Sequence, residues 1–407
     1  MSALSGLRVL DLSRVLAGPW CTQTLADLGA EVTKVERLGT GDDTRAWGPP
    51  WREMSQKGER DSAYFLSANR NKKSVAIDIS ITEGAELVRK LAARSDVLVE
   101  NFKVGSLQRY GLSYEDLKQV NPALVYCSIT GFGQQGPYAG RAGYDFLIQG
   151  MGGLMSITGT PDGKPGAGPQ KVGVALTDIL TGMYAATGIL AAVMESRTTG
   201  RGQHIDVSLL DVQIASLANQ AMNYLVGGQA PQRLGNAHPN IVPYQDFRTQ
   251  DGYMILAIGN DAQFKRFCEV VGQSGWAYDN RYATNSARIM HRNALIDAIA
   301  NVIDKKTTAY WIEKMEAAGV PCGPINTIED VFADRHVAQR QANFTISSSK
   351  GEIPSVANPL KLSESPVEYR LAPPALGQDS RQILCDELGM TSQEIDELIK
   401  RNIVACV

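Results

Sequence analysis

The chain has 407 residues, 43% of them hydrophobic, and a formal net charge of −3. This length and apolar content predict a large buried core divided over two or three domains. The slightly acidic balance argues against a nucleic-acid-binding protein that neutralises phosphates, because such proteins are basic. The six cysteines form no CxxC pair, which argues against a zinc ribbon or a redox dithiol and favours reduced thiols in the cytosol.

Neither the N-terminal apolar run nor the most apolar helix fits an export signal or a membrane span. Arg8 and Asp11 interrupt the first apolar run, so the N-terminus does not read as a signal peptide. The most apolar helix is expected at about 179–194, which is too short to span a bilayer and contains Gly182 and Gly188. We therefore expect a soluble, cytoplasmic protein with neither a membrane nor a nucleic acid as partner.

The first part of the chain alternates between apolar runs typical of strands and amphipathic stretches typical of helices. The expected strands are 7–12, 31–36, 74–79, 96–100 and 123–130, and the helices expected among them are 18–28, 82–94 and 113–120. This alternation predicts an α/β fold with a parallel, doubly wound sheet. No G-x-G-x-x-G motif follows the first strand, which disfavours a nicotinamide or flavin cofactor.

The rest of the chain predicts a smaller domain inserted into a larger one. Further helices are expected at 144–155, 209–225, 261–271, 288–303, 308–318, 379–388 and 391–400, with strands at 204–207 and 251–258. The composition shifts near Gly227 and returns to a regular pattern after Ile325. We therefore divide the chain into 1–225, the first part of a large α/β domain; 226–330, a small α+β domain with linkers; and 331–407, a return to the large domain.

Asp178 is the only acidic residue between Asp162 and Glu195, at the start of a helix rich in glycine and alanine. One interpretation is a helix cap, in which the carboxylate accepts hydrogen bonds from the N–H groups of the first turn. The other is a catalytic nucleophile placed where those N–H groups also meet a ligand. Local sequence alone favours the cap.

Several other residues are candidates for ligand contacts. Ligands of parallel α/β sheets bind at the carboxyl ends of strands, where Asn101 is expected. Arg45 lies in a loop rich in glycine and proline, and His238 lies in the irregular stretch 227–240; each is either a ligand contact or an ordinary loop residue. The stretch 159–164 has the glycines and lysine of a phosphate-binding loop, but no Ser or Thr follows the lysine, so we read it as a turn and disfavour an ATP-driven ligase.

Seven ordered motifs carry a resemblance to the class III CoA-transferases, the family that includes formyl-CoA transferase and carnitine CoA-transferase. They lie at 10–19, 28–37, 71–74, 99–102, 128–133, 136–138 and 199–203. No single motif is decisive, but their order over nearly the whole chain is specific. The resemblance implies a Rossmann-like large domain built from both chain ends and an interlocked homodimer.

The resemblance also implies a set of site residues and a chemistry. Asp178 matches the nucleophilic aspartate of the family, and Asp145 matches an assisting acidic residue. The positions that match CoA contacts are Arg37 at the nucleotide end, Asn101, Phe102, Arg109, Tyr110 and Arg141. CoA enters as a thioester substrate, with no permanently bound cofactor and no metal. Exchanging one thioester for another is close to thermoneutral, which agrees with the missing nucleotide motif.

Within the family the sequence departs from formyl-CoA transferase. Leu16 stands where that enzyme has a glutamine, and no long run of glycines is present, which disfavours formate or oxalate. The stretches 41–50 and 235–244 look more like the succinyl-CoA:glutarate transferase branch. We therefore expect transfer of CoA from succinyl-CoA to a dicarboxylate such as glutarate through an aspartyl mixed anhydride. Arg45 or His238 would bind the distal carboxylate.

Two alternatives remain open. The α-methylacyl-CoA racemases share this fold and are isomerases, but they carry a histidine before the acidic residue where this chain has Tyr144. An acid–base pair without its histidine would be poor. The second alternative is a CoA-binding protein without catalysis, against which the setting of Asp178 argues.

Overall fold

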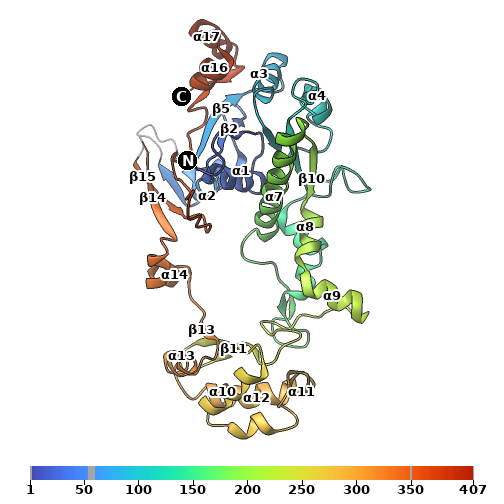
Figure 1. The fold of residues 1–407 in the computed structure, drawn as a ribbon, viewed down its shortest axis with the longest axis vertical. Coiled ribbons are helices and arrows are strands. Elements are labelled where there is room, and N and C mark those ends of the chain that lie inside the picture. Colours follow the sequence, from blue (N-terminus) through green and yellow to red (C-terminus); the bar gives the residue numbers. More distant parts are fainter. Residues whose placement is uncertain (1, 54–59, 349–350, 407) are drawn as a thin grey trace. The chain divides into compact units, whose positions relative to one another are not determined.

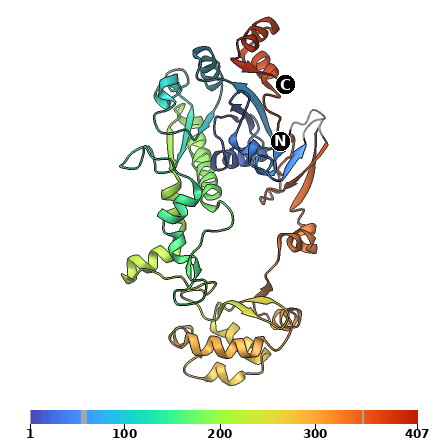
Figure 2. The same cartoon turned by 180° about the vertical axis from the view of Figure 1, so that it is seen from behind.

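The computed structural model describes residues 2–53, 60–348 and 351–406, and Figures 1 and 2 show the chain from two sides. The chain forms two compact units: the first is Met1–Leu154, Lys171–Gln229 and Ala338–Val407, and the second is Met155–Gln170 and Ala230–Val337. These boundaries differ from the expected 225 and 330, and the segment 155–170, expected in the large domain, belongs to the second unit.

The first unit is built on a seven-stranded sheet in the order β10-β7-β6-β1-β2-β5-β16. Its strands are β1 (Arg8–Asp11), β2 (Glu31–Glu36), β5 (Lys72–Ile77), β6 (Val97–Glu100), β7 (Val125–Thr130), β10 (His204–Ser208) and β16 (Val404–Ala405). All neighbours are parallel except β16, which is antiparallel to β5. Read across the sheet from β5 to β10, the strands come third, second, first, fourth, fifth and sixth in the chain. This is the order of doubly wound sheets, which bind ligands at the point where the strand order reverses. Here that point lies between β1 and β6.

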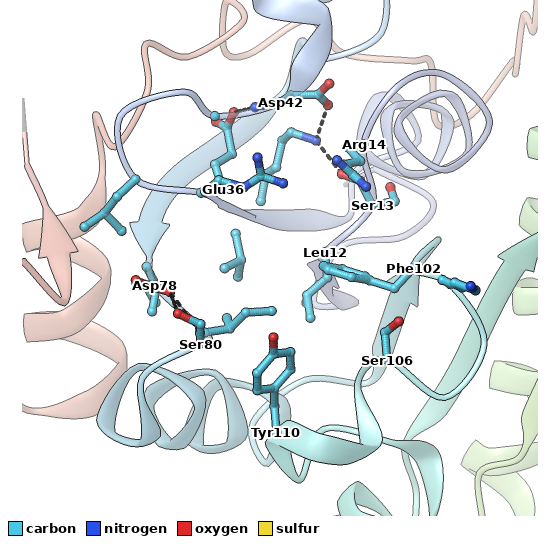
Figure 3. A pocket seen from close by; sticks show the side chains of 18 of the residues that line it. Leu12, Ser13, Arg14, Glu36, Asp42, Asp78, Ser80, Phe102, Ser106 and Tyr110 are labelled. Carbon is cyan, nitrogen blue, oxygen red and sulfur yellow. Dashed lines mark hydrogen bonds and ion pairs between the residues drawn. The ribbon is translucent and has the colours of Figure 1, made fainter. Parts of the chain in front are cut away.

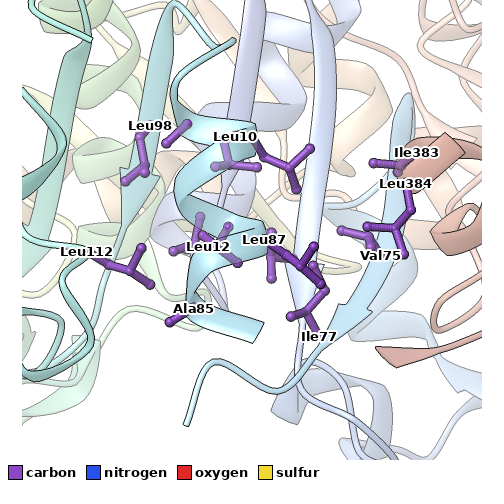
Figure 4. Packing of buried hydrophobic residues seen from close by; sticks show 14 of the residues in the cluster. Leu10, Leu12, Val75, Ile77, Ala85, Leu87, Leu98, Leu112, Ile383 and Leu384 are labelled. Carbon is purple, nitrogen blue, oxygen red and sulfur yellow. The ribbon is translucent and has the colours of Figure 1, made fainter. Parts of the chain in front are cut away.

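Alternating side chains of the strands face two apolar layers, one on each side of the sheet. The helices concerned are α1 (Ala17–Asp27), α3 (Thr82–Ala92), α7 (Leu176–Thr199), α16 (Ser380–Leu388) and α17 (Ser392–Lys400). On one face Leu10 packs with side chains of α3, α16 and α17, and Figure 4 shows Leu87 and Leu384 in this layer. On the other face Val9 packs with α1 and α7. The expected α/β class with helices on both faces is confirmed, and the last two helices join this unit as expected.

Helix α7 is longer than the sequence indicated. It has 24 residues, and by length and composition alone it could cross a membrane, so the expectation that it is too short is wrong. Half of its most apolar stretch is buried inside the unit. It packs against α1 and β7, and both views show it beside α1, so its position is that of a core helix.

The first unit contains further helices and strands. They are β3 (Trp51–Glu53), β4 (Arg60–Ser62), α2 (Ala63–Ser67), α4 (Tyr114–Leu117), α5 (Asp145–Met151), α8 (Leu209–Ser216), α9 (Ala218–Gly227), β14 (Asn343–Ser348) and β15 (Gly351–Val356). Helix α6 (Leu154–Ile157) begins at the last residue of this unit's first segment and continues into the second unit. The helix expected at 209–225 is interrupted, because Ala218 has a φ of 45° and ends the regular pattern of α8. The helix expected at 144–155 breaks in the same way at Gly153, with a φ of 87°.

The second unit is an α+β structure with its own core. Its elements are β8 (Gly159–Thr160), β9 (Gly168–Pro169), β11 (Tyr244–Arg248), β12 (Tyr253–Ala257), α10 (Asp261–Val270), α11 (Asn285–Met290), α12 (Arg292–Ile303), α13 (Thr308–Ala317), β13 (Cys322–Pro324), α14 (Ile328–Ala333) and α15 (Arg335–Gln339). Helix α15 continues past the last residue of this unit into the first unit. Strands β11, β12 and β13 form an antiparallel sheet over an apolar core that includes Phe264 and Trp311. The short pair β8 and β9 brackets Lys164, so the glycine-rich stretch there is a turn, as expected.

Candidate active site

Asp178 is the third residue of α7, and its side chain does not cap the helix. The N-cap position is Ala175, which makes no side-chain cap hydrogen bond. In the described part of the chain, the Asp178 carboxylate accepts no hydrogen bond, and it lines a cavity of about 420 Å³, which we call the Asp178 cavity. The cap interpretation is therefore wrong, and the carboxylate is open to a ligand.

The environment of Asp178 disfavours its charge. Burial raises the pKa of this carboxyl from 3.8 to about 7, and the nearby carboxylate of Asp145 adds to the rise. A carboxylate with no hydrogen-bond donor and little water around it is a better nucleophile than a solvated one. The position is thus suited to attack on a carbonyl group.

Asp145 supplies the cap that Asp178 does not. Its Oδ1 accepts a hydrogen bond from the backbone N–H of Thr177 at 2.9 Å, and its Oδ2 accepts one from Nε2 of Gln149 at 2.7 Å. Asp145 opens α5 and does not line the Asp178 cavity. Its expected role as an assisting acid stays a prediction, and the structure shows a carboxylate that holds the first turn of α7.

The Asp178 cavity lies at the point where the strand order of the sheet reverses. The loops that follow β1 and β6 are tied together there, because Arg14 N–H donates to Oδ1 of Asn101 at 3.0 Å and Nδ2 of Asn101 donates to the Arg14 carbonyl at 2.6 Å. Val15 has a φ of 72°, a strained conformation for a β-branched residue. Its N–H is held by Asp42 at 3.1 Å. This strained loop delivers Leu16 and the start of α1 to the cavity.

A second cavity of about 600 Å³ adjoins the first, and we call it the Arg37 cavity. Both cavities are lined by Arg14, Phe102 and Lys103, so together they form an extended site. Figure 3 shows the Arg37 cavity, with the Tyr110 hydroxyl pointing into it from one side and Glu36 on the opposite side.

Most of the residues predicted from the sequence lie on these two cavities. Leu16, Asn101, Phe102, Arg141 and Asp178 line the Asp178 cavity. Arg37, Phe102, Arg109 and Tyr110 line the Arg37 cavity. The family motifs thus converge in space from segments that are far apart in the chain.

Arg45 is placed differently from the expectation. Its guanidinium is buried and donates to Glu36 at 2.7 and 2.9 Å, to Asp61 at 2.8 Å and to the carbonyl of Pro374 at 3.0 Å. It also stacks on the ring of Phe65 and lines neither cavity. This arginine is a structural ion-pair partner in the first unit, and these contacts occupy its donors.

His238 belongs to the second unit, where its contacts are local. Its Nδ1 accepts a hydrogen bond from the N–H of Asn240 at 3.0 Å, and its ring packs on that of Tyr244. Burial and the charge of Arg292 lower the pKa of this imidazole. The expectation that His238 binds a substrate carboxylate stays a prediction.

Sequence reasoning missed several residues of the site. Trp47 and Lys103 line the Asp178 cavity, and Tyr64 packs edge-on against Trp47 with its ring centroid 5.3 Å away. Burial and the charges of Asp178 and Asp145 raise the pKa of Tyr64 to about 12. Lys103 follows a recognised motif directly and could have been found, whereas Tyr64 has no local signal.

Buried ion pairs support the loop that carries Val15. Lys34 pairs with Asp42 at 3.0 Å and also donates to the Ser13 carbonyl at 2.7 Å. Lys72 pairs with Asp11 at 3.1 Å beneath the same loop. Both pairs are fully buried, so they fix the loop without offering charge to solvent.

Comparison with known proteins identifies the family. A sequence profile described as CoA-transferase family III matches residues 4–380. The chain belongs to CoA-transferase family III. Among its relatives in this family, a succinate–glutarate CoA-transferase of Agrobacterium fabrum is 50% identical over 384 residues, covering 94% of this chain and 95% of that protein. A succinyl-CoA:glutarate CoA-transferase of Mus musculus is 42% identical over 405 residues, covering 99% and 91% of the two chains.

A solved structure supports the family III fold over the same length. The crystal structure of a CAIB/BAIF family protein from Brucella suis is 48% identical to this chain. It superposes with a TM-score of 0.83 and covers 95% of this chain and 99% of that one. The resemblance inferred from the seven motifs is confirmed.

Proposed function

We propose that this CoA-transferase moves CoA between succinyl-CoA and glutarate through covalent intermediates on Asp178. The observation that carries the proposal is an unbonded, buried carboxylate at the cavity where the family motifs converge. The names of the relatives at 50% and 42% identity support the choice of acids. The reaction is an exchange of acyl partners, for which a nucleophile, two substrates and the exclusion of water suffice.

The exchange can be written as four nucleophilic attacks, each of which forms one bond and breaks another. The Asp178 carboxylate attacks the thioester carbonyl of succinyl-CoA, the C–S bond breaks, and CoA thiolate leaves a succinyl-aspartyl anhydride. The thiolate then attacks the aspartyl carbonyl, which releases succinate and forms an aspartyl-CoA thioester. Glutarate attacks that thioester, which releases thiolate and forms a glutaryl-aspartyl anhydride. The thiolate finally attacks the glutaryl carbonyl, giving glutaryl-CoA and free Asp178.

The oxyanion formed in each step needs hydrogen-bond donors. The N–H of Thr177 is held by Asp145, so it is not available for this purpose. Helix α1 also begins at the cavity, and its first-turn donors without an intrahelical partner are the N–H groups of Ala17 and Gly18. We assign the oxyanion to these donors, with apolar Leu16 beside them helping to keep water away.

The two adjoining cavities suit the length of a CoA thioester. The thioester would lie in the Asp178 cavity, the pantetheine arm would pass Asn101 and Phe102, and the nucleotide end would reach Arg37 and Arg109. The cations that line the Asp178 cavity are Arg14, Lys103 and Arg141, and Arg14 is paired with Asp43 at 2.6 Å. Lys103 and Arg141 are therefore better placed than Arg45 to meet the distal carboxylate of a dicarboxylate.

The proposal includes a homodimer in the cytoplasm with interlocked chains. Support comes from α9, where Met222, Tyr224, Leu225 and Val226 are more than half exposed. No residue of α9 is buried within the described chain. A cluster of apolar side chains of this kind normally packs against another protein surface. A second copy would provide that surface.

The transfer reaction tests the proposal directly. Incubation with succinyl-CoA and a panel of mono- and dicarboxylic acids, followed by mass spectrometry, should show glutaryl-CoA formed at the highest rate. Asp178→Asn should lose at least about 1,000-fold in kcat, because the nucleophile is removed. The exposed Asp297→Asn is the matched control and should retain the activity of the parent protein.

Two outcomes would contradict the proposal. One is a correctly folded protein that transfers CoA to none of the acids, and the other is full activity of Asp178→Asn. Deuterium uptake at C2 of a branched acyl-CoA would instead indicate an isomerase of the racemase type.

A further inference from the structure

Two buried glutamines hold the start of α7 and the segment just before it. Gln149 comes from α5 and Gln213 from α8, and their exposed fractions are 0% and 1%. Neither side chain reaches the Asp178 cavity. A fully buried glutamine must have its amide group hydrogen-bonded, so its partners show what it holds in place.

Gln149 fixes the segment that leads into α7. Its Nε2 donates to Oδ2 of Asp145 at 2.7 Å, and its Oε1 accepts the N–H of Val172 at 2.9 Å. The other oxygen of Asp145 accepts the N–H of Thr177 at 2.9 Å. One side chain thus orients the carboxylate that caps the helix and anchors the chain a few residues before it.

Gln213 bonds the first turn of α7 directly. Its Oε1 accepts a hydrogen bond from Oγ1 of Thr177 at 2.6 Å. This contact needs a close approach to α5, because a Cβ built at Gly152 would lie 2.4 Å from Cγ of Gln213. Gly152 has a φ of −83°, which any residue adopts, so the glycine is required by space and not by backbone conformation.

We propose that Gln149 and Gln213 are positioning residues for Asp178, an inference that rests on Asp178 being the nucleophile. The carboxylate itself accepts no hydrogen bond from a described residue, so its direction is set by the backbone of the turn that carries it. Thr177, the residue before it, is held through its N–H by Asp145 and through its hydroxyl by Gln213. The site therefore orients its nucleophile without hydrogen bonds that would stabilise its charge and weaken it.

Substitutions that keep volume and remove the hydrogen bonds test this role. Gln213→Met, Gln149→Met and Thr177→Val should each lower kcat by about 10- to 100-fold, because a nucleophile displaced by a fraction of an ångström attacks poorly. The KM for succinyl-CoA should stay within about twofold of the parent value, since none of these side chains lines the Asp178 cavity or the Arg37 cavity. Thr177→Ser keeps the hydroxyl and should restore most of the activity. The double variant Thr177→Val with Gln213→Met should be no slower than the worse single variant.

Gln23→Met is the matched control, because Gln23 is a buried glutamine of the same unit that bonds Ser67 and Arg70 and not α7. It should lose stability with less than about a threefold change in kcat. The inference is overturned if Thr177→Val equals Thr177→Ser in kcat, or if Gln23→Met slows the reaction as much as Gln213→Met. A failure of the proposed function is separate, since Asp178→Asn would then stay active. If a glutamine variant does not fold, the comparison of Thr177→Val with Thr177→Ser still tests the inference.

Discussion

At the scale of single residues, the unusual feature is that Asp178 is buried and that no described residue donates a hydrogen bond to its carboxylate. Its pKa of about 7, against an ordinary 3.8, means that the folded state disfavours the ionised form. Burying a charge without a partner is a cost that most proteins avoid by pairing it. A carboxylate kept in such a setting fits a role in reaction more than a role in stability.

The cost of burying this charge can be measured as a change in the free energy of unfolding with pH. Well below pH 3.8 the carboxyl is neutral in both the folded and unfolded states, so its ionisation has no effect on folding. As the pH rises towards 7 the unfolded chain releases the proton and the folded chain keeps it, so stability falls until the pH passes about 7. Asp178→Asn should therefore raise the free energy of unfolding by about 2 to 4 kcal/mol at pH 8 and by much less near pH 4.

Urea unfolding at the two pH values provides the measurement. Asp297→Asn, at an exposed position, should change the free energy of unfolding by less than about 0.5 kcal/mol at both. A gain for Asp178→Asn that is the same at pH 4 and pH 8 would show that charge burial is not its cause.

At the scale of elements, the packing of α1 against α7 brings together the two helix starts that the chemistry uses. Gly182 allows this packing, because a Cβ at that position would lie 2.6 Å from the Ala17 carbonyl and 3.2 Å from the N of Cys21. Gly182, Ala185, Gly188 and Ala192 lie three or four positions apart, a spacing that is typical of one packing face of a helix. Gly188 in fact faces Ile205, with its nearest atom 3.6 Å away, so the four residues do not serve one contact.

The two glycines of α7 should therefore respond oppositely to alanine. Gly182→Ala should destabilise the protein by about 1 to 3 kcal/mol, because the added methyl group pushes against backbone. Gly188→Ala has room and gains helix propensity, so it should be neutral or stabilising by up to about 1 kcal/mol. Chemical unfolding of both variants tests the pair, and a loss of similar size in each would contradict the packing described for α7.

At the scale of the whole molecule, the proposed homodimer would cover the exposed apolar residues of α9. We expect light scattering to give twice the chain mass of 44.0 kDa. Leu225→Glu combined with Val226→Glu should shift the mass towards that of one chain, because their 72% and 80% exposed side chains would no longer suit an apolar interface.

Val120→Glu, at an isolated position that is 40% exposed, is the control and should leave the mass unchanged. A protein that elutes as a single chain at micromolar concentration would exclude the proposed dimer. Full dimerisation of the α9 double variant would show instead that another surface forms the contact.

The sequence by itself determined the α/β class and the family, and most of the site residues that it predicted line one of the two cavities. These properties depend on strand and helix periodicity and on motifs that are local in the chain, such as the one that contains Asn101 and Phe102. The family motifs also pointed to Asp178 as the nucleophile, whereas the local sequence favoured a helix cap. A local pattern does not show which carboxylate accepts the hydrogen bonds of the first turn, and here it is that of Asp145.

The tertiary structure alone decided which polar residues are free to meet a ligand. Arg45 has the same chemistry as Arg141, yet the first is enclosed by Glu36 and Asp61 and the second lines the Asp178 cavity. Gln149 and Gln213 lie 64 positions apart in the chain, and both hold the start of α7 or the segment just before it. The physical reason is that pairing and burial are set by contacts between distant segments, which a local pattern of residue types does not contain.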